Sequence, residues 1–205
     1  MVGKGEETED VSSETLKTSI VIESLSRSSS LVELSLRNIA FGEPCPLEDF
    51  LSSTRTLLDF SYFQDYSTMT YRAAQAIGRG FAQNNSLVKL QWHAPYGFDF
   101  MEEVLFGLLD HKKLTNLDLA LSLSKSSSQA LRSLLHCNEI MERLDLTLSG
   151  DMEQFPAPVL AGLANNTNLK EVLIHSQYSK NDTTLAAAWT DMLRRNTSIK
   201  LLDLT

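Results

Sequence analysis

The four histidines of this chain are the first candidates for chemistry, because imidazole can bind metal ions and transfer protons near neutral pH. They are His93, His111, His136 and His175. Only His136 has another histidine or a cysteine close by in sequence, and that residue, Cys137, is its immediate neighbour. Adjacent residues cannot easily hold one ion on a helix, and most structural zinc sites need four ligands. We therefore expect no metal site.

Other signatures of catalysis are also missing from the sequence. Gly78 and Gly80 stand close together, but no Lys-Ser or Lys-Thr pair follows them as in a phosphate-binding loop. No serine has the Gly-x-Ser-x-Gly context of a nucleophile elbow. The sequence therefore predicts that the protein is not an enzyme and that it carries no cofactor.

The feature that must position any binding residue is a short phrase that recurs seven times: apolar, two residues, apolar, one residue, apolar. The copies are Leu31-Leu34-Leu36, Leu57-Phe60-Tyr62, Leu87-Leu90-Trp92, Leu114-Leu117-Leu119, Met141-Leu144-Leu146, Leu169-Val172-Ile174 and Ile199-Leu202-Leu204. They start at positions 31 to 199, so the mean period is 28 residues. A fixed period of roughly 20–50 residues indicates a repeat architecture.

Each copy is typical of a short strand, and the stretch that follows is typical of a helix. We expect helices over 71–81 and near 99–110, and only about two helical turns within 46–53. In the last helix, inward positions would include Met192 and Leu193. The sequence thus predicts an α/β array of about seven units over residues 14–205.

The two ends of the chain differ from these units. Residues 1–13 are acidic and polar, so we expect a disordered tail. Leu16, Ile20, Ile22 and Leu25 have a rough helical spacing, which predicts a helix that caps the array. The last copy is a strand with no helix after it, so we expect either a truncated array or an edge that pairs with another chain.

Alternation along each strand turns three positions of every unit away from the core. The first set is Glu33, Asp59, Lys89, Asn116, Arg143, Glu171 and Leu201. The second set is Ser35, Ser61, Gln91, Asp118, Asp145, Leu173 and Asp203. The third set is Arg37, Phe63, His93, Ala120, Thr147, His175 and Thr205. These positions are the best binding candidates.

From these positions and the adjoining loops we predict one partner-binding surface. Its residues are Asp59, Phe63, Tyr66, Lys89, Gln91, His93, Tyr96, Asp118, Arg143, Asp145, Glu171 and His175. Tyr66 and Tyr96 belong to the loops at the rim, where aromatic side chains either anchor a partner or fill irregular loops. The same alternatives hold for Phe41, whereas Trp92 occupies an inward position and is expected in the core.

Two finer features of this surface leave alternatives open. Asp118 and Asp145 fall on neighbouring strands, so they either form an acidic spot for a basic partner residue or are neutralised by Arg143. Leu173 and Leu201, with Ala120, either begin an apolar contact patch or are covered by further repeats.

Composition narrows the class of partner and compartment. The net charge of −8 and the pI of about 5.0 argue against nucleic-acid binding. Cys45 and Cys137 lie in different units, which predicts reduced thiols. The chain shows no apolar signal segment at its start and no stretch of ~18 apolar residues. We therefore expect a cytoplasmic protein that does not bind membranes.

An asparagine stands three residues before four of the seven copies, at Asn84, Asn138, Asn166 and Asn196. Asparagine tolerates the left-handed conformation that closes a helix, so we expect that conformation here. The stretch 161–172, Ala-Gly-Leu-Ala-Asn-Asn-Thr-Asn-Leu-Lys-Glu-Val, resembles leucine-rich repeats of the ribonuclease-inhibitor type. The order helix, Asn, Thr or Ser, Leu, strand is similar to repeats of tropomodulin and of NOD-like receptors.

This resemblance implies a curved solenoid, with parallel strands on the concave face and helices on the convex face. The asparagine that the family places three residues after the copy is missing from every unit, which marks a divergent member. The function we expect is a non-enzymatic protein-interaction or scaffold module that binds through the concave face and rim loops. The alternative is a regulatory array that acts on actin or a small GTPase, as in tropomodulin or Ran GTPase-activating protein.

Overall fold

The computed structural model describes residues 20–39, 41, 43–65, 69–94, 100–122, 124–149, 156–176 and 183–204. The strands are β1 (Glu33–Arg37), β2 (Asp59–Phe63), β3 (Lys89–Ala94), β4 (Asn116–Ser122), β5 (Arg143–Ser149), β6 (Glu171–Ser176) and β7 (Leu201–Leu204). The helices are α2 (Pro46–Ser53), α3 (Tyr71–Gln83), α4 (Met101–Gly107), α5 (Lys125–Cys137), α6 (Pro156–Asn165) and α7 (Thr183–Arg195). Residues 20–26 are also helical.

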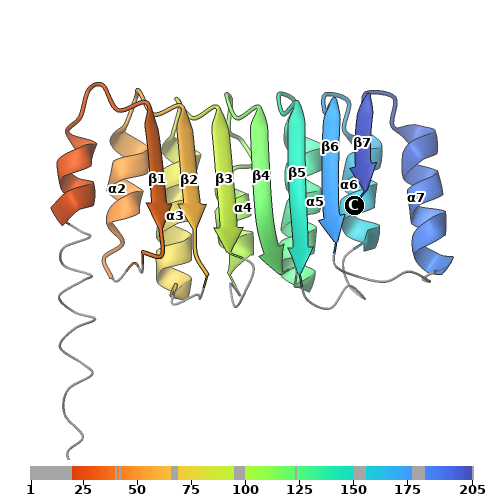
Figure 1. Ribbon diagram of the computed structural model, residues 1–205, viewed down its shortest axis with the longest axis horizontal. Helices are drawn as coiled ribbons and strands as arrows, with labels where there is room; N and C mark the ends of the chain where they lie inside the picture. The colour runs from red at the N-terminus through yellow and green to blue at the C-terminus, as the bar shows by residue number, and fades with distance from the viewer. Residues whose placement is uncertain are drawn as a thin grey trace, which may run out of the picture.

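The fold is α/β, with the seven described strands in one parallel sheet whose order follows the chain. Parallel neighbours need a crossover connection, and here a helix separates each strand from the next. The described helices lie together on one face of the sheet, and the other face is turned toward the viewer (Figure 1). The predicted alternation of strand and helix is therefore confirmed. The predicted tail, residues 1–13, lies outside the described residues.

The core forms where the inward strand positions meet the helices. The second apolar positions are in register across the sheet: Leu34, Phe60, Leu90, Leu117, Leu144, Val172 and Leu202. The five central members are at most 1% exposed. Leu34 and Leu202 are partly buried because they stand on the edge strands. One apolar file thus runs through the molecule, as the period predicts.

The aromatic core confirms one further expectation and decides one open alternative. Trp92 is fully buried, and its ring lies 4.5 Å from that of Tyr62. Phe41, only 3% exposed, packs 5.7 Å from the same tyrosine ring. Phe41 therefore fills the core and does not anchor a partner.

Local signals explain where the helices begin. Thr70 precedes α3, and its Oγ1 accepts a hydrogen bond from the Ala73 N–H at 3.1 Å. Ser124 and Ser127 form a capping box at the start of α5. The helix α4 is shorter than the expected 99–110. Leu193 was predicted to point inward, but 58% of it is exposed.

Two glycines allow α3 and α4 to pack with their backbones in contact. A Cβ on Gly107 would lie 2.1 Å from the carbonyl oxygen of Gly78, and a Cβ on Gly78 would lie 2.3 Å from that of Glu103. No side chain fits at such distances. Gly78, noted in the sequence, therefore serves helix packing together with Gly107.

The recurring asparagines hold the turn through their side chains and not through a left-handed backbone. Asn84 and Asn138 have φ values of −73° and −80°, so the expected left-handed conformation is wrong. In Asn166, Oδ1 accepts hydrogen bonds from the backbone N–H groups of Asn168 and Leu169, at 2.9 and 2.7 Å. Its Nδ2 donates to the carbonyl of Leu135, in the preceding unit, at 2.7 Å.

Asn84 and Asn196 make the same two kinds of contact. Each accepts from the turn with Oδ1 and donates with Nδ2 to the helix of the preceding unit, at 2.7 Å in both cases. A single side chain therefore closes each turn and also ties one unit to the one before. Asparagine suits these three positions because its amide supplies both a donor and an acceptor.

This chain of contacts is interrupted at the fourth unit, where His111 replaces asparagine. His111 Nδ1 accepts from the Leu114 N–H at 3.2 Å, as an asparagine oxygen would. Its Nε2 is buried with no hydrogen-bond partner among the described residues, and so is Nδ2 of Asn138 in the next unit. Burial, assisted by Lys113, lowers the pKa of His111 to about 4. Both joints of the fourth unit thus lack the contact that Asn84, Asn166 and Asn196 make.

Candidate functional site

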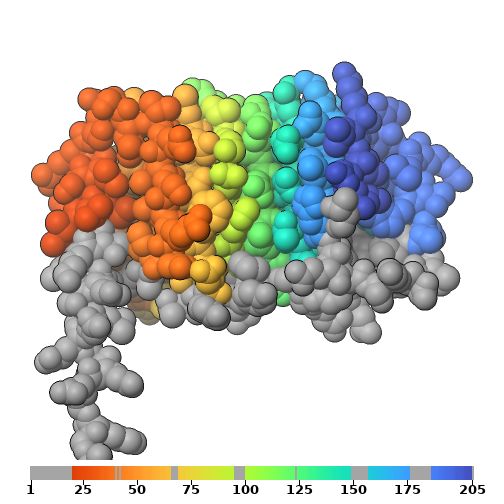
Figure 2. All heavy atoms as spheres, viewed as in Figure 1, coloured from red at the N-terminus to blue at the C-terminus, as the bar shows by residue number. Residues whose placement is uncertain are grey.

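The three predicted outward sets lie in rows across the sheet. Glu33, Asp59, Lys89, Asn116, Arg143, Glu171 and Leu201 are successive register partners. Ser35, Ser61, Gln91, Asp118, Asp145, Leu173 and Asp203 form the central row. Arg37, Phe63, His93, Ala120, Thr147 and His175 form the third row. We call the surface made by these three rows the open face. Its atoms form successive bands from β1 to β7 in Figure 2.

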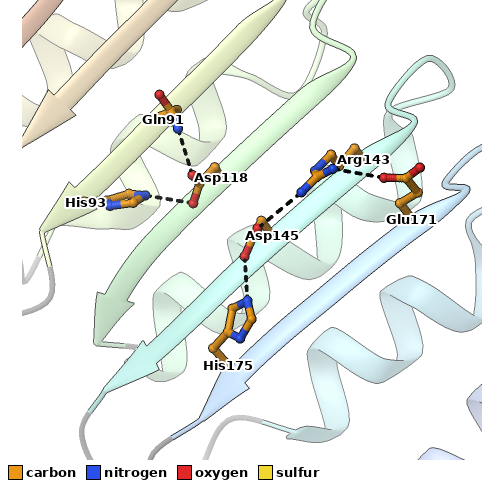
Figure 3. A network of polar contacts seen from close by, with 7 residues as sticks. All are labelled: Gln91, His93, Asp118, Arg143, Asp145, Glu171 and His175. Atoms are coloured by element: carbon orange, nitrogen blue, oxygen red, sulfur yellow. Dashed lines mark hydrogen bonds and ion pairs between the residues drawn. The ribbon is translucent and has the colours of Figure 1, made fainter. Parts of the chain in front are cut away.

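Asp118, at the centre of the open face, is firmly held by side chains of β3. His93 Nε2 lies 2.8 Å from Asp118 Oδ1, and Gln91 Nε2 donates to Oδ2 at 3.0 Å (Figure 3). Burial acts to raise the pKa of Asp118, but the hydrogen bonds from His93 and Gln91, with the charges of His93 and Lys89, outweigh it. The pKa of Asp118 therefore lies below its usual value.

Asp145, beside it on β5, is held more loosely. Its carboxylate lies 3.4 Å from His175 Nε2 and 3.8 Å from Arg143 Nη2. Burial first, and then the negative charge of Asp118, raise the pKa of Asp145, against the opposing charges of His175 and Arg143. The two register partners are thus driven in opposite directions.

The structure decides between the two readings of Arg143. Its Nη1 donates to Glu171 Oε2 at 3.1 Å, and its Nη2 lies near Asp145 (Figure 3). It makes no ion pair with Asp118 within the described part of the chain. The idea that Arg143 neutralises Asp118 is therefore wrong, because Asp118 is held instead by hydrogen bonds with His93 and Gln91.

The N-terminal part of the open face carries a second group of predicted residues. Lys89 Nζ donates to Asp59 Oδ2 at 2.9 Å. The ring of Phe63 lies 5.0 Å from the His93 imidazole, and the Arg37 guanidinium carbon lies 4.9 Å from the Phe63 centroid. Phe63 is the last residue of β2. These contacts join the predicted residues into one layer.

The remaining predictions have mixed outcomes. Tyr66 and Tyr96 lie outside the described residues. Leu173 is partly exposed and Leu201 is 47% exposed, so both present apolar surface near β7. Ala120 is only 7% exposed and adds little to an apolar patch there.

Sequence reasoning named both histidines and both aspartates but missed that each histidine contacts one of the aspartates. His93 and His175 each stand one row below an aspartate on an adjacent strand. Diagonal neighbours on one face are within reach of long or aromatic side chains. This diagonal spacing could have been found in the sequence, because the period of the repeat gives the register of the strands.

The described residues contain no group of three or more His, Cys, Asp and Glu side chains arranged to hold a metal ion. None of the described helices is long and apolar enough to cross a membrane. A comparison with protein-family models gives no match, and no curated protein sequence matches the chain. The arrangement of the open face is therefore the basis for any functional argument.

Proposed function

We propose that this protein is a divergent leucine-rich-repeat solenoid of the ribonuclease-inhibitor type, and that it binds another protein through its open face. One observation carries the proposal: charged, amide and aromatic side chains stand in register on a sheet face that no described helix covers (Figure 1). A seven-stranded sheet offers a broad surface to a partner, and the unit period of 28 residues fits this repeat class.

The contacts within the open face support a binding role because they order its side chains in advance. Gln91 accepts from Ser61 Oγ at 2.9 Å and donates to Asp118 at 3.0 Å. Lys89 and Arg143 each have a carboxylate partner on a neighbouring strand. Side chains fixed in this way lose less conformational entropy when a partner binds.

Affinity capture from a native lysate tests the proposal. The substitutions Lys89→Glu and Arg143→Glu reverse charge on the open face, and we expect them to reduce the captured partner by about tenfold or more. Arg132→Glu, on the exposed side of α5, is the matched control and should leave capture unchanged. Circular dichroism confirms that each variant is folded. Equal capture by folded wild type and both open-face variants would contradict the proposal.

A further inference from the structure

The half of the open face over β4 to β7 is dominated by carboxylates. Its outward positions hold Asp118, Asp145, Glu171 and Asp203, against Arg143 as the only lysine or arginine among the described outward residues. Arg143 is already engaged with Glu171 and Asp145. The half-face therefore keeps an excess of negative charge.

The two carboxylates at either side of Leu173 are the weakly paired ones. Asp145 has His175 Nε2 at 3.4 Å and Arg143 Nη2 at 3.8 Å, both longer than an ordinary charge-assisted hydrogen bond. Asp203 makes no ion pair with a described residue. Asp118, by contrast, is occupied by His93 and Gln91.

Apolar surface lies between these weakly paired carboxylates. Leu173 is the register partner of both Asp145 and Asp203. Leu201, 47% exposed, stands diagonally beside Leu173 and faces the same way. The order across the strands is therefore acidic, apolar, acidic.

The spacing of this pattern matches one secondary structure in a partner. Asp145 and Asp203 are separated by two inter-strand steps, or about 9.6 Å. Residues seven apart on an α-helix are separated by about 10.5 Å along its axis and lie on one side, with positions three and four between them. A helix that lies across β5 to β7 can thus place two cations and an intervening apolar side chain in register.

We propose that β4 to β7 of the open face bind a basic amphipathic helix of the partner protein. Cations at helix positions i and i+7 pair with Asp145 and Asp203, and apolar residues at i+3 and i+4 cover Leu173 and Leu201. This inference rests on the proposed function and adds the chemical class of the partner segment.

Two synthetic helical peptides of about 18 residues, roughly 27 Å long, test the inference by fluorescence anisotropy. The basic peptide carries lysine at i and i+7 and leucine at i+3 and i+4, and the acidic peptide has glutamate in place of each lysine. We expect only the basic peptide to bind, and we expect its affinity to fall as salt rises from about 50 to about 300 mM.

Substitutions in the protein then locate the contact. Asp145→Asn and Asp203→Asn should each weaken binding of the basic peptide by about fivefold. Leu173→Ser should also weaken it. Asp191→Asn on α7, at an exposed carboxylate on the helix side, is the matched control and should change nothing.

Three outcomes would overturn the inference: no binding of the basic peptide, equal binding of both peptides, or full affinity in both aspartate variants. If one of these outcomes occurs while partner capture still depends on Lys89 and Arg143, only the basic helix is contradicted. The proposed function then stands. If partner capture does not depend on Lys89 and Arg143 and the peptide test also fails, both proposals are contradicted.

Discussion

His93 Nε2 lies 2.8 Å from Asp118 Oδ1, across the boundary between two adjacent parallel strands. The contact is diagonal, from the third outward row to the central row. It fixes the carboxylate that is the register partner of Asp145. The charge state at the centre of the open face therefore depends on a histidine as well as on the two aspartates.

Carboxyl NMR titration should separate the two aspartates. We expect Asp118 to titrate below the ordinary aspartate value of 3.8, because His93 and Gln91 hold its charged form, and we expect Asp145 to titrate above that value. Substituting His93→Leu should raise the pKa of Asp118. The two carboxyl groups titrating together in the wild type would contradict this description.

The pKa shifts of Asp118 and Asp145 have opposite consequences for the stability of the fold. The pKa of Asp118 is lower in the folded state, so its contribution is present above the unfolded pKa and is lost as pH falls through the folded pKa. The pKa of Asp145 is raised, so its effect on stability is favourable at low pH and is lost as pH rises through the folded pKa.

A second prediction concerns the turn asparagine Asn166, which is 4% exposed. Asn166→Ala leaves the backbone N–H groups of Asn168 and Leu169 and the carbonyl of Leu135 without their side-chain partner. Unmade hydrogen bonds of buried groups are costly, so urea unfolding should show a loss of about 2–4 kcal/mol. Thr167→Ala, at the exposed next position, should stay within about 0.5 kcal/mol.

A third prediction follows from the interruption at His111. Its pKa is about 4 in the folded protein and about 6.5 when unfolded, so between these values only the unfolded state takes up a proton. Stability from this group is therefore present above pH 6.5 and lost as pH falls toward 4, by up to about 3 kcal/mol. His111→Asn should remove this loss and raise stability most at low pH.

The comparison of unfolding free energies at pH 5 and pH 8 checks this effect. His136→Asn, at an exposed histidine of α5, is the matched control for the histidine-to-asparagine change itself. An equal gain for His111→Asn at both pH values would show that hydrogen bonding alone, without protonation, explains the substitution.

The fourth prediction concerns the contact between α3 and α4. Gly107→Ala places a Cβ about 2.1 Å from the Gly78 carbonyl oxygen, so the helices must move apart. We expect a loss of several kcal/mol, roughly 3 or more, in urea unfolding. Gly162→Ala, where the nearest atom lies at 3.1 Å, should lose clearly less. Similar losses for the two variants would contradict the close packing of α3 on α4.

Much of the fold could be predicted from the sequence because two periods overlap in it. The alternation within each copy determines which side chains leave the core, and the 28-residue period determines which strands are neighbours. Together they predicted the row that contains Asp118 and Asp145, and the structure has that register. The α2 helix, Pro46–Ser53, also lies where the sequence allowed about two turns.

The rest depended on side-chain geometry that periodicity does not contain. The asparagine pattern was visible, but the sequence does not distinguish a left-handed residue from one that acts through its side chain. Asn84 and Asn138 have extended backbone and act through their amides. Likewise Arg143 has Asp118, Asp145 and Glu171 nearby, and its contacts with Glu171 and Asp145 depend on where its side chain points.

The central claim is that a partner protein contacts the open face, and site-specific photo-crosslinking tests it most directly. A photoreactive residue at Thr147, partly exposed in the middle of the open face, is compared in lysate with one at Arg132, exposed on α5. We predict a protein adduct from position 147 and none from position 132. Adducts from position 132 alone would contradict binding through the open face.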